Sequence, residues 1–104
     1  MTPDDLKSLL GMPPRAARVA VAERSGKGDH VVERLAFDFG DDRPVRGLLT
    51  RPAGAGGPYP AVLYCHAHGN KYAIGGSELL IGGPSLFGPY GPFLAEAGLV
   101  CLCL

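Results

Sequence analysis

Hydrophobic and polar positions alternate through much of the first half of the chain, which predicts antiparallel strands with one solvated face. In the segment 31–39, Leu35 and Phe37 fall on one side, whereas Arg34 and Asp38 fall on the other. Residues rich in Gly, Asp and Pro separate the alternating segments and are typical of turns. The predicted strands are residues 16–23, 31–39 and 45–51, with turns over 25–29 and 40–44. This half therefore predicts a meander of about three strands.

The pattern changes after the Gly/Pro loop at 52–60. Apolar residues now run without alternation, which indicates strands covered on both faces. The predicted elements are a strand over 61–65, one helical turn over 78–81, a helix over 92–97 that Gly98 ends, and a strand over 99–104. A strand, a helix and a second strand predict a right-handed βαβ unit with a parallel pair. The fold class is therefore α/β.

The N-terminus predicts a short peripheral helix. Thr2 suits the N-cap, Pro3 suits the first helical position, and Gly11 ends the element. We therefore divide the chain into a helix with its linker, residues 1–15, and the portion of a single α/β domain, residues 16–104.

Composition narrows the function classes. The 104 residues carry ten basic and ten acidic side chains, so that no basic excess favours nucleic acid. No apolar run of about eighteen residues predicts a membrane span, and the N-terminus lacks the apolar core of a signal peptide. The three Cys are an odd number without a secretory signal, which indicates reduced thiols. We expect a cytoplasmic protein with no nucleic-acid or membrane partner.

Candidate chemistry gathers in 61-AVLYCHAHGN-70, where two histidines and a glycine follow a predicted strand directly. A phosphate loop would need Gly, four residues, then Gly-Lys-Ser/Thr. Lys71 is instead followed by Tyr72, and the earlier glycine is absent. This interpretation therefore receives little weight.

A metal site is the second interpretation. His66 and His68 have the same i,i+2 spacing as Cys101 and Cys103, and zinc accepts both residue types. Cysteines in apolar strands, however, usually pack as small hydrophobic side chains. We therefore predict no metal, and we expect Cys65 to lie within its strand, where burial makes it a poor nucleophile.

An oxyanion corner is the third interpretation. Acyl transfer places negative charge on a carbonyl oxygen, which backbone N–H groups fixed at a sharp turn can stabilise. The candidate donors are the backbone amides of Ala67 and His68. Ala67 and Gly69 are small enough to let a substrate approach. The His66 imidazole and Gly69 would support the corner.

Three segments carry a family resemblance: PAVLYCHAHGN, NKYAIGGSELL and GPYGPFLAEAGLVCLCL. Together they cover about Pro58–Leu104 and resemble the N-terminal part of an α/β-hydrolase, nearest to the dienelactone-hydrolase and acetyl-xylan-esterase-like branches. The family usually has His-Gly at this corner, whereas this chain has His66-Ala67-His68-Gly69. The resemblance implies a sheet that opens with an antiparallel meander, turns parallel and here stops after about the fourth strand. It also implies a small-molecule ester or acyl substrate and no cofactor.

The resemblance further implies a Ser–Asp/Glu–His triad with its serine in G-x-S-x-G. Ser77 and Ser85 both lack that context, so loop hydrogen bonding is expected of them. His30 is predicted to be a solvated turn residue, and Glu78 is the only acid near His68. We therefore predict no catalytic residue in this chain. The triad is expected beyond Leu104, where an unbroken apolar strand stops, and these 104 residues alone should be inactive.

Two questions stay open from the sequence. Tyr72, Phe87 and Tyr90 could line the substrate cleft, or they could cover an edge of the sheet. The alternative to an enzyme is a non-catalytic module that pairs with a partner, or with itself, through exposed strands.

Overall fold

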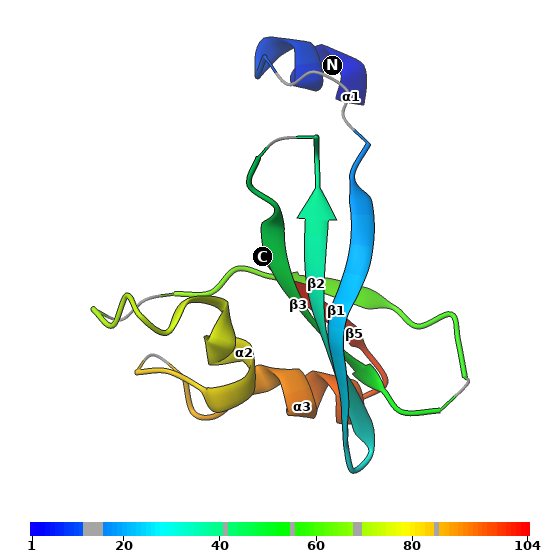
Figure 1. The fold of residues 1–104 in the computed structure, drawn as a ribbon, viewed down its shortest axis with the longest axis vertical. Helices are drawn as coiled ribbons and strands as arrows, with labels where there is room; N and C mark the ends of the chain where they lie inside the picture. Colours follow the sequence, from blue (N-terminus) through cyan, green and yellow to red (C-terminus); the bar gives the residue numbers. More distant parts are fainter. Residues whose placement is uncertain (12–15, 41, 55, 68–69, 85) are drawn as a thin grey trace.

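The computed structural model describes residues 1–11, 16–40, 42–54, 56–67, 70–84 and 86–104. It contains a five-stranded sheet flanked by short helices (Figure 1). The elements in chain order are α1 (Pro3–Leu9), β1 (Arg18–Lys27), β2 (His30–Asp38), β3 (Val45–Pro52), β4 (Ala61–Tyr64), the 3₁₀ helix η1 (Gly75–Ser77), α2 (Glu78–Ile81), α3 (Tyr90–Glu96) and β5 (Val100–Cys103).

The strands lie in the order β1-β2-β3-β5-β4. The pairs β1–β2, β2–β3 and β3–β5 are antiparallel, and β4–β5 is parallel. The structure thus confirms the predicted mixed α/β class, the meander and the single parallel pair. The described residues form five strands, as many as the sequence pattern predicts, whereas the family resemblance implied a stop after about the fourth. Because β5 lies between β3 and β4, the two edges of the sheet are β1 and β4.

One face of the sheet carries the core. The register aligns Val32 in β2 with Thr50 in β3 and Cys101 in β5, so these side chains share a face. The buried cluster on this face also contains Leu79 from α2. Cys101 and Cys103 are buried free thiols. The prediction that they pack as small hydrophobic side chains is confirmed.

The helix α3 approaches the sheet closely at Gly91. The Thr50 hydroxyl donates a hydrogen bond to the Gly91 carbonyl oxygen at 3.3 Å. A Cβ placed on Gly91 would lie 2.8 Å from the carbonyl oxygen of Leu79 and 2.9 Å from the Thr50 methyl group. These distances are shorter than van der Waals contact, so only glycine fits where α2, α3 and β3 meet.

The opposite face of the sheet remains open among the described residues. Its exposed apolar side chains are Val19, Val21, Val45, Leu63 and Leu104. The radius of gyration is 15.4 Å, whereas a compact domain of this length would have about 13 Å. Among the described residues, α2 and α3 both pack on the face that carries Val32 and Leu48, so helices cover one side of the sheet only.

An ion-pair cluster occupies part of this open face. The Glu33 carboxylate accepts hydrogen bonds from Arg24 at 3.0 Å and from Arg51 at 3.0 and 2.9 Å. The Glu33 side chain is 10% exposed, because the two arginine side chains shield it from solvent. The cluster therefore links β1, β2 and β3 across the meander.

The N-terminal helix α1 is peripheral, as predicted. Thr2 and Asp5 form a capping box, and none of the helical residues is buried. Gly11 has a φ of 64°, in the left-handed region that favours glycine, and follows the helix end. Figure 1 shows α1 beyond one end of the sheet.

The structure corrects three sequence expectations. The turn predicted over 25–29 is only Gly28-Asp29, so His30 belongs to β2 and is buried rather than solvated. The strand β4 is not covered on both faces, because it forms an edge and its residues 61–63 are exposed. Cys65 lies just beyond β4 and is exposed rather than buried in a strand.

We predict that Gly91→Ala destabilises the protein by about 1–3 kcal/mol, because the added methyl group overpacks the junction of α2, α3 and β3. Helix propensity alone predicts the opposite sign, a gain of up to about 1 kcal/mol. Chemical denaturation followed by circular dichroism measures the difference. Gly26→Ala is the matched control, since a Cβ there meets nothing within 4 Å. A stabilised Gly91→Ala variant would contradict the close packing.

Candidate functional site

The corner after β4 is described up to Ala67. The His66 Nδ1–H donates a hydrogen bond to the Ala67 carbonyl oxygen at 3.2 Å, so the imidazole lies against the backbone of the corner. Both residues are exposed. His68 and Gly69, the other residues assigned to the corner from the sequence, lie outside the described residues. Their roles and the two amide donors therefore stay predictions.

The corner contacts the end of β5. The Cys103 thiol donates a hydrogen bond to the Leu104 carbonyl oxygen at 3.9 Å. Burial raises the pKa of the Cys103 thiol, and the nearby His66 backbone opposes the rise only in part. Cys103 is therefore kept as a neutral thiol that packs beneath the corner. It is not suited to act as a nucleophile.

A buried carboxylate lies beside the end of β4, the strand that pairs with β5. Glu78, the first residue of α2, is 3% exposed and accepts a hydrogen bond from the Tyr64 hydroxyl at 2.9 Å. The Tyr64 ring packs edge-on against Tyr90 of α3, with ring centroids 6.0 Å apart. The last residue of β4 is thereby tied to both helices, immediately before the corner.

Burial, together with the hydrogen bond to the Glu78 carboxylate, raises the pKa of Tyr64 to about 12. Removing the phenol proton would desolvate a new negative charge and place it beside an existing one. The Tyr64 hydroxyl therefore stays protonated and donates its hydrogen bond to the Glu78 carboxylate.

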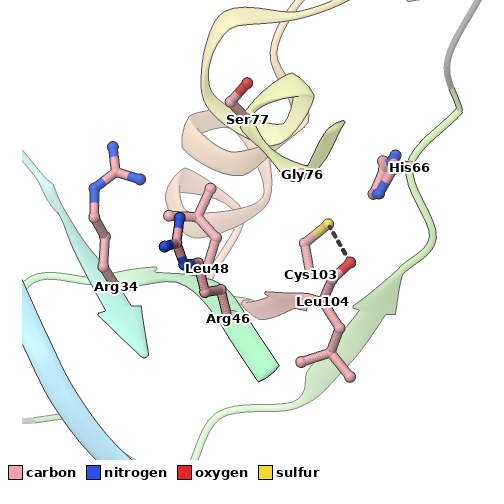
Figure 2. A pocket seen from close by; sticks show the side chains of 9 residues that line it. Arg34, Arg46, Leu48, His66, Gly76, Ser77, Cys103 and Leu104 are labelled. Atoms are coloured by element: carbon pink, nitrogen blue, oxygen red, sulfur yellow. Dashed lines mark hydrogen bonds between the residues drawn. The ribbon is translucent and has the colours of Figure 1, made fainter. Parts of the chain in front are cut away.

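A cavity of about 360 Å³ opens next to the corner (Figure 2). His66 lines one side, and Arg34 from β2 and Arg46 from β3 line the other. The remaining lining residues are Gly47, Leu48, Gly76, Ser77, Cys103 and Leu104. No acidic side chain is among the described residues that line it.

Three aromatic residues, for which the sequence left a substrate cleft and a sheet edge open, do not line this cavity. Phe87 is fully exposed and Tyr72 is largely exposed, whereas Tyr90 packs on Tyr64. None of the three lines the cavity beside His66. Their part in a cleft stays a prediction.

The two serines and the metal ligands considered from the sequence are only partly described. The Ser77 hydroxyl donates to the Ile74 carbonyl oxygen, as expected of a loop hydrogen bond. Ser85 lies outside the described residues. Among residues whose placement is described, no group of three or more His, Cys, Asp or Glu side chains could hold a metal ion. No described helix is long and apolar enough to cross a membrane.

Comparison with known proteins gives one informative relative. The chain is 34% identical over 83 residues to a Bacillus subtilis (strain 168) protein named "Putative hydrolase YtaP". The match covers 78% of this chain but only 28% of the relative. No known protein-family profile matches the chain, and no solved structure matches it.

Sequence reasoning missed two features around His66 and Ala67. Glu78 was considered only as the nearby acid for His68, because spacing alone does not show that its side chain turns toward Tyr64. Arg34 was placed only on the polar side of its strand, and Arg46 was not singled out. The antiparallel register brings them together, and the alternation pattern of a single strand carries no signal for that pairing.

We predict that Tyr64 ionises with a midpoint near pH 12, above the value of about 10 for an unfolded tyrosine. Since the folded-state pKa is the higher one, the contribution of neutral Tyr64 to stability is complete below about pH 10 and is lost as the pH rises toward 12. Phenolate absorbance after a rapid pH jump measures this step, and Tyr64→Phe should remove it. Glu78→Gln should lower the midpoint. A midpoint unchanged by Glu78→Gln would contradict the contact.

Proposed function

We propose that this chain is the N-terminal portion of a serine hydrolase of α/β-hydrolase type, which acts on a carboxylic ester or related acyl bond. The observation that carries the proposal is that His66 and Ala67 directly follow β4, which pairs in parallel with β5, and that the sequence continues with His68-Gly69. The chain spans less than a third of the Bacillus subtilis relative that it matches. The activity of a whole protein is therefore part of the proposal. The dienelactone-hydrolase or esterase branch rests on the sequence resemblance alone.

The sheet supports this proposal in two ways. The strand order β1-β2-β3-β5-β4 leaves β4, the strand that carries the corner, at an edge where a further parallel strand can pair. Leu63 on that strand is 63% exposed, and it belongs to the open apolar face. Parallel strands are normally covered on both faces. A larger domain would supply both the neighbouring strand and the second layer.

The proposed role of the corner is electrostatic. The amides of Ala67 and His68 would donate to the oxygen that becomes negative during acyl transfer. The His66 imidazole, bonded to the Ala67 carbonyl oxygen, would hold the peptide planes in place. The nearness of the His66 backbone to Cys103 would anchor the corner to β5. No described serine has the setting of a nucleophile, so the triad would come from residues outside these 104.

A non-catalytic, self-associating module is the second candidate, favoured by the exposed β4 edge and the open apolar face. That candidate explains the exposed surfaces, but it assigns no role to the corner. The hydrolase proposal accounts for both features, so we prefer it.

The decisive variants change the corner backbone in the protein expressed from its complete native reading frame. Ala67→Pro removes one amide donor and should lower kcat for p-nitrophenyl acetate by about 10²–10³-fold. Ala67→Gly keeps the amide and is the matched control, for which near-native activity is expected. Thermal unfolding of both variants checks the fold.

Full activity in a folded Ala67→Pro variant would exclude Ala67 as a donor. No ester hydrolysis by the native protein, together with no serine labelled by a fluorophosphonate, would reject the hydrolase proposal as a whole. The 104-residue chain alone should be inactive in both assays.

A further inference from the structure

The cavity beside His66 is lined by two arginines and, among the described residues, by no acidic side chain. In the β2–β3 register, Arg34 lies opposite Leu48, and Ala36 lies opposite Arg46. Arg34 and Arg46 are therefore diagonal neighbours on one face, a relation in which long side chains reach each other. Both line the cavity, and Figure 2 shows both guanidinium groups on the side of the cavity away from His66.

Neither arginine is satisfied by a strong ion pair. Arg34 meets Glu23 at 3.5 Å, but both side chains are more than half exposed, so the pair contributes little. Within the described ranges, no ion pair or hydrogen bond is formed by the Arg46 side chain. Two positive charges within reach of each other repel, although a diagonal pair on a sheet repels less than a directly opposite one. A bound anion would offset that repulsion.

We propose that this cavity binds the phosphate group of a small phosphomonoester. Two guanidinium groups present several N–H donors, which suits an ion with three acceptor oxygens. Their combined charge, which the exposed Glu23 carboxylate beside Arg34 offsets only in part, favours the nearly two negative charges of such a phosphate at neutral pH. A carboxylate carries only one.

The rest of the cavity suits the organic part of the ester. The volume of about 360 Å³ exceeds what the phosphate group alone requires, and it lies within the range of small-molecule sites. Leu48, Leu104 and Gly47 offer an apolar wall next to the arginines. The inference goes beyond the proposed hydrolase function and does not depend on it, because binding needs no catalytic residue.

The test is a titration of the 104-residue protein with phenyl phosphate, inorganic phosphate and benzoate at constant ionic strength, followed by amide chemical shifts in NMR spectra. We expect saturable binding of phenyl phosphate, weaker binding of inorganic phosphate and the weakest binding of benzoate. Arg46→Gln and Arg34→Gln should each weaken phenyl phosphate binding by about tenfold, the loss expected for a charged hydrogen bond. Arg46→Lys should fall between the native protein and Arg46→Gln, since it keeps the charge but loses the planar fork.

Arg18→Gln is the matched control, because Arg18 is an exposed strand arginine that does not line the cavity. Its affinity should equal that of the native protein, and unfolding curves should show all variants folded.

Equal weakening of phenyl phosphate binding by Arg18→Gln would overturn the site in favour of diffuse surface charge. Binding that does not saturate would overturn the site outright. Benzoate binding as tight as phenyl phosphate would assign a carboxylate site instead. If inorganic phosphate bound as tightly as phenyl phosphate, the ligand of the cavity would be the free phosphate ion and not a phosphomonoester. None of these outcomes depends on ester hydrolysis, so failure here and failure of the hydrolase proposal are distinguishable.

Discussion

One-sided burial of the sheet is the constraint on which the rest of the structure depends. The helices α2 and α3 cover a single face of the sheet. Their packing is closest where Gly91 contacts Thr50 and the Leu79 carbonyl oxygen. That junction fixes both helices against β3. The buried thiols of β5 complete the same layer. The opposite face has no such layer among the described residues, although Leu35 is buried there and the Glu33 ion-pair cluster shields part of that face.

The candidate site follows from this layer. Because α2 packs on the sheet, the Glu78 carboxylate reaches the Tyr64 hydroxyl at the end of β4. Because β5 lies beside β4, Cys103 lies beneath the backbone of His66. The corner thus begins at the end of β4, which the Tyr64–Glu78 hydrogen bond and the pairing with β5 fix in place. The same arrangement leaves a cavity between the corner and the arginines of β2 and β3.

Much of the fold could be predicted from local pattern. Alternation located the meander, and Gly11 and Gly98, both with positive φ, ended helices as predicted. The failures have physical causes. An apolar run such as 61–65 indicates a strand but not how many neighbours cover it, so the exposure of β4 and Cys65 was missed. The turn between β1 and β2 is shorter than predicted, so His30 pairs within β2 and is buried instead of solvated. Side-chain partners such as Tyr64 with Glu78 depend on tertiary packing, which spacing along the chain does not reveal.

The central claim is that this chain belongs to a larger serine hydrolase, and its most direct test is to read the native coding sequence beyond the codon for Leu104. The account predicts that the frame continues and encodes a G-x-S-x-G motif, then an acidic residue and then a histidine, in that order. A stop codon directly after Leu104 would contradict it. The corner would then have no nucleophile to serve, and the exposed face and β4 edge would point to self-association.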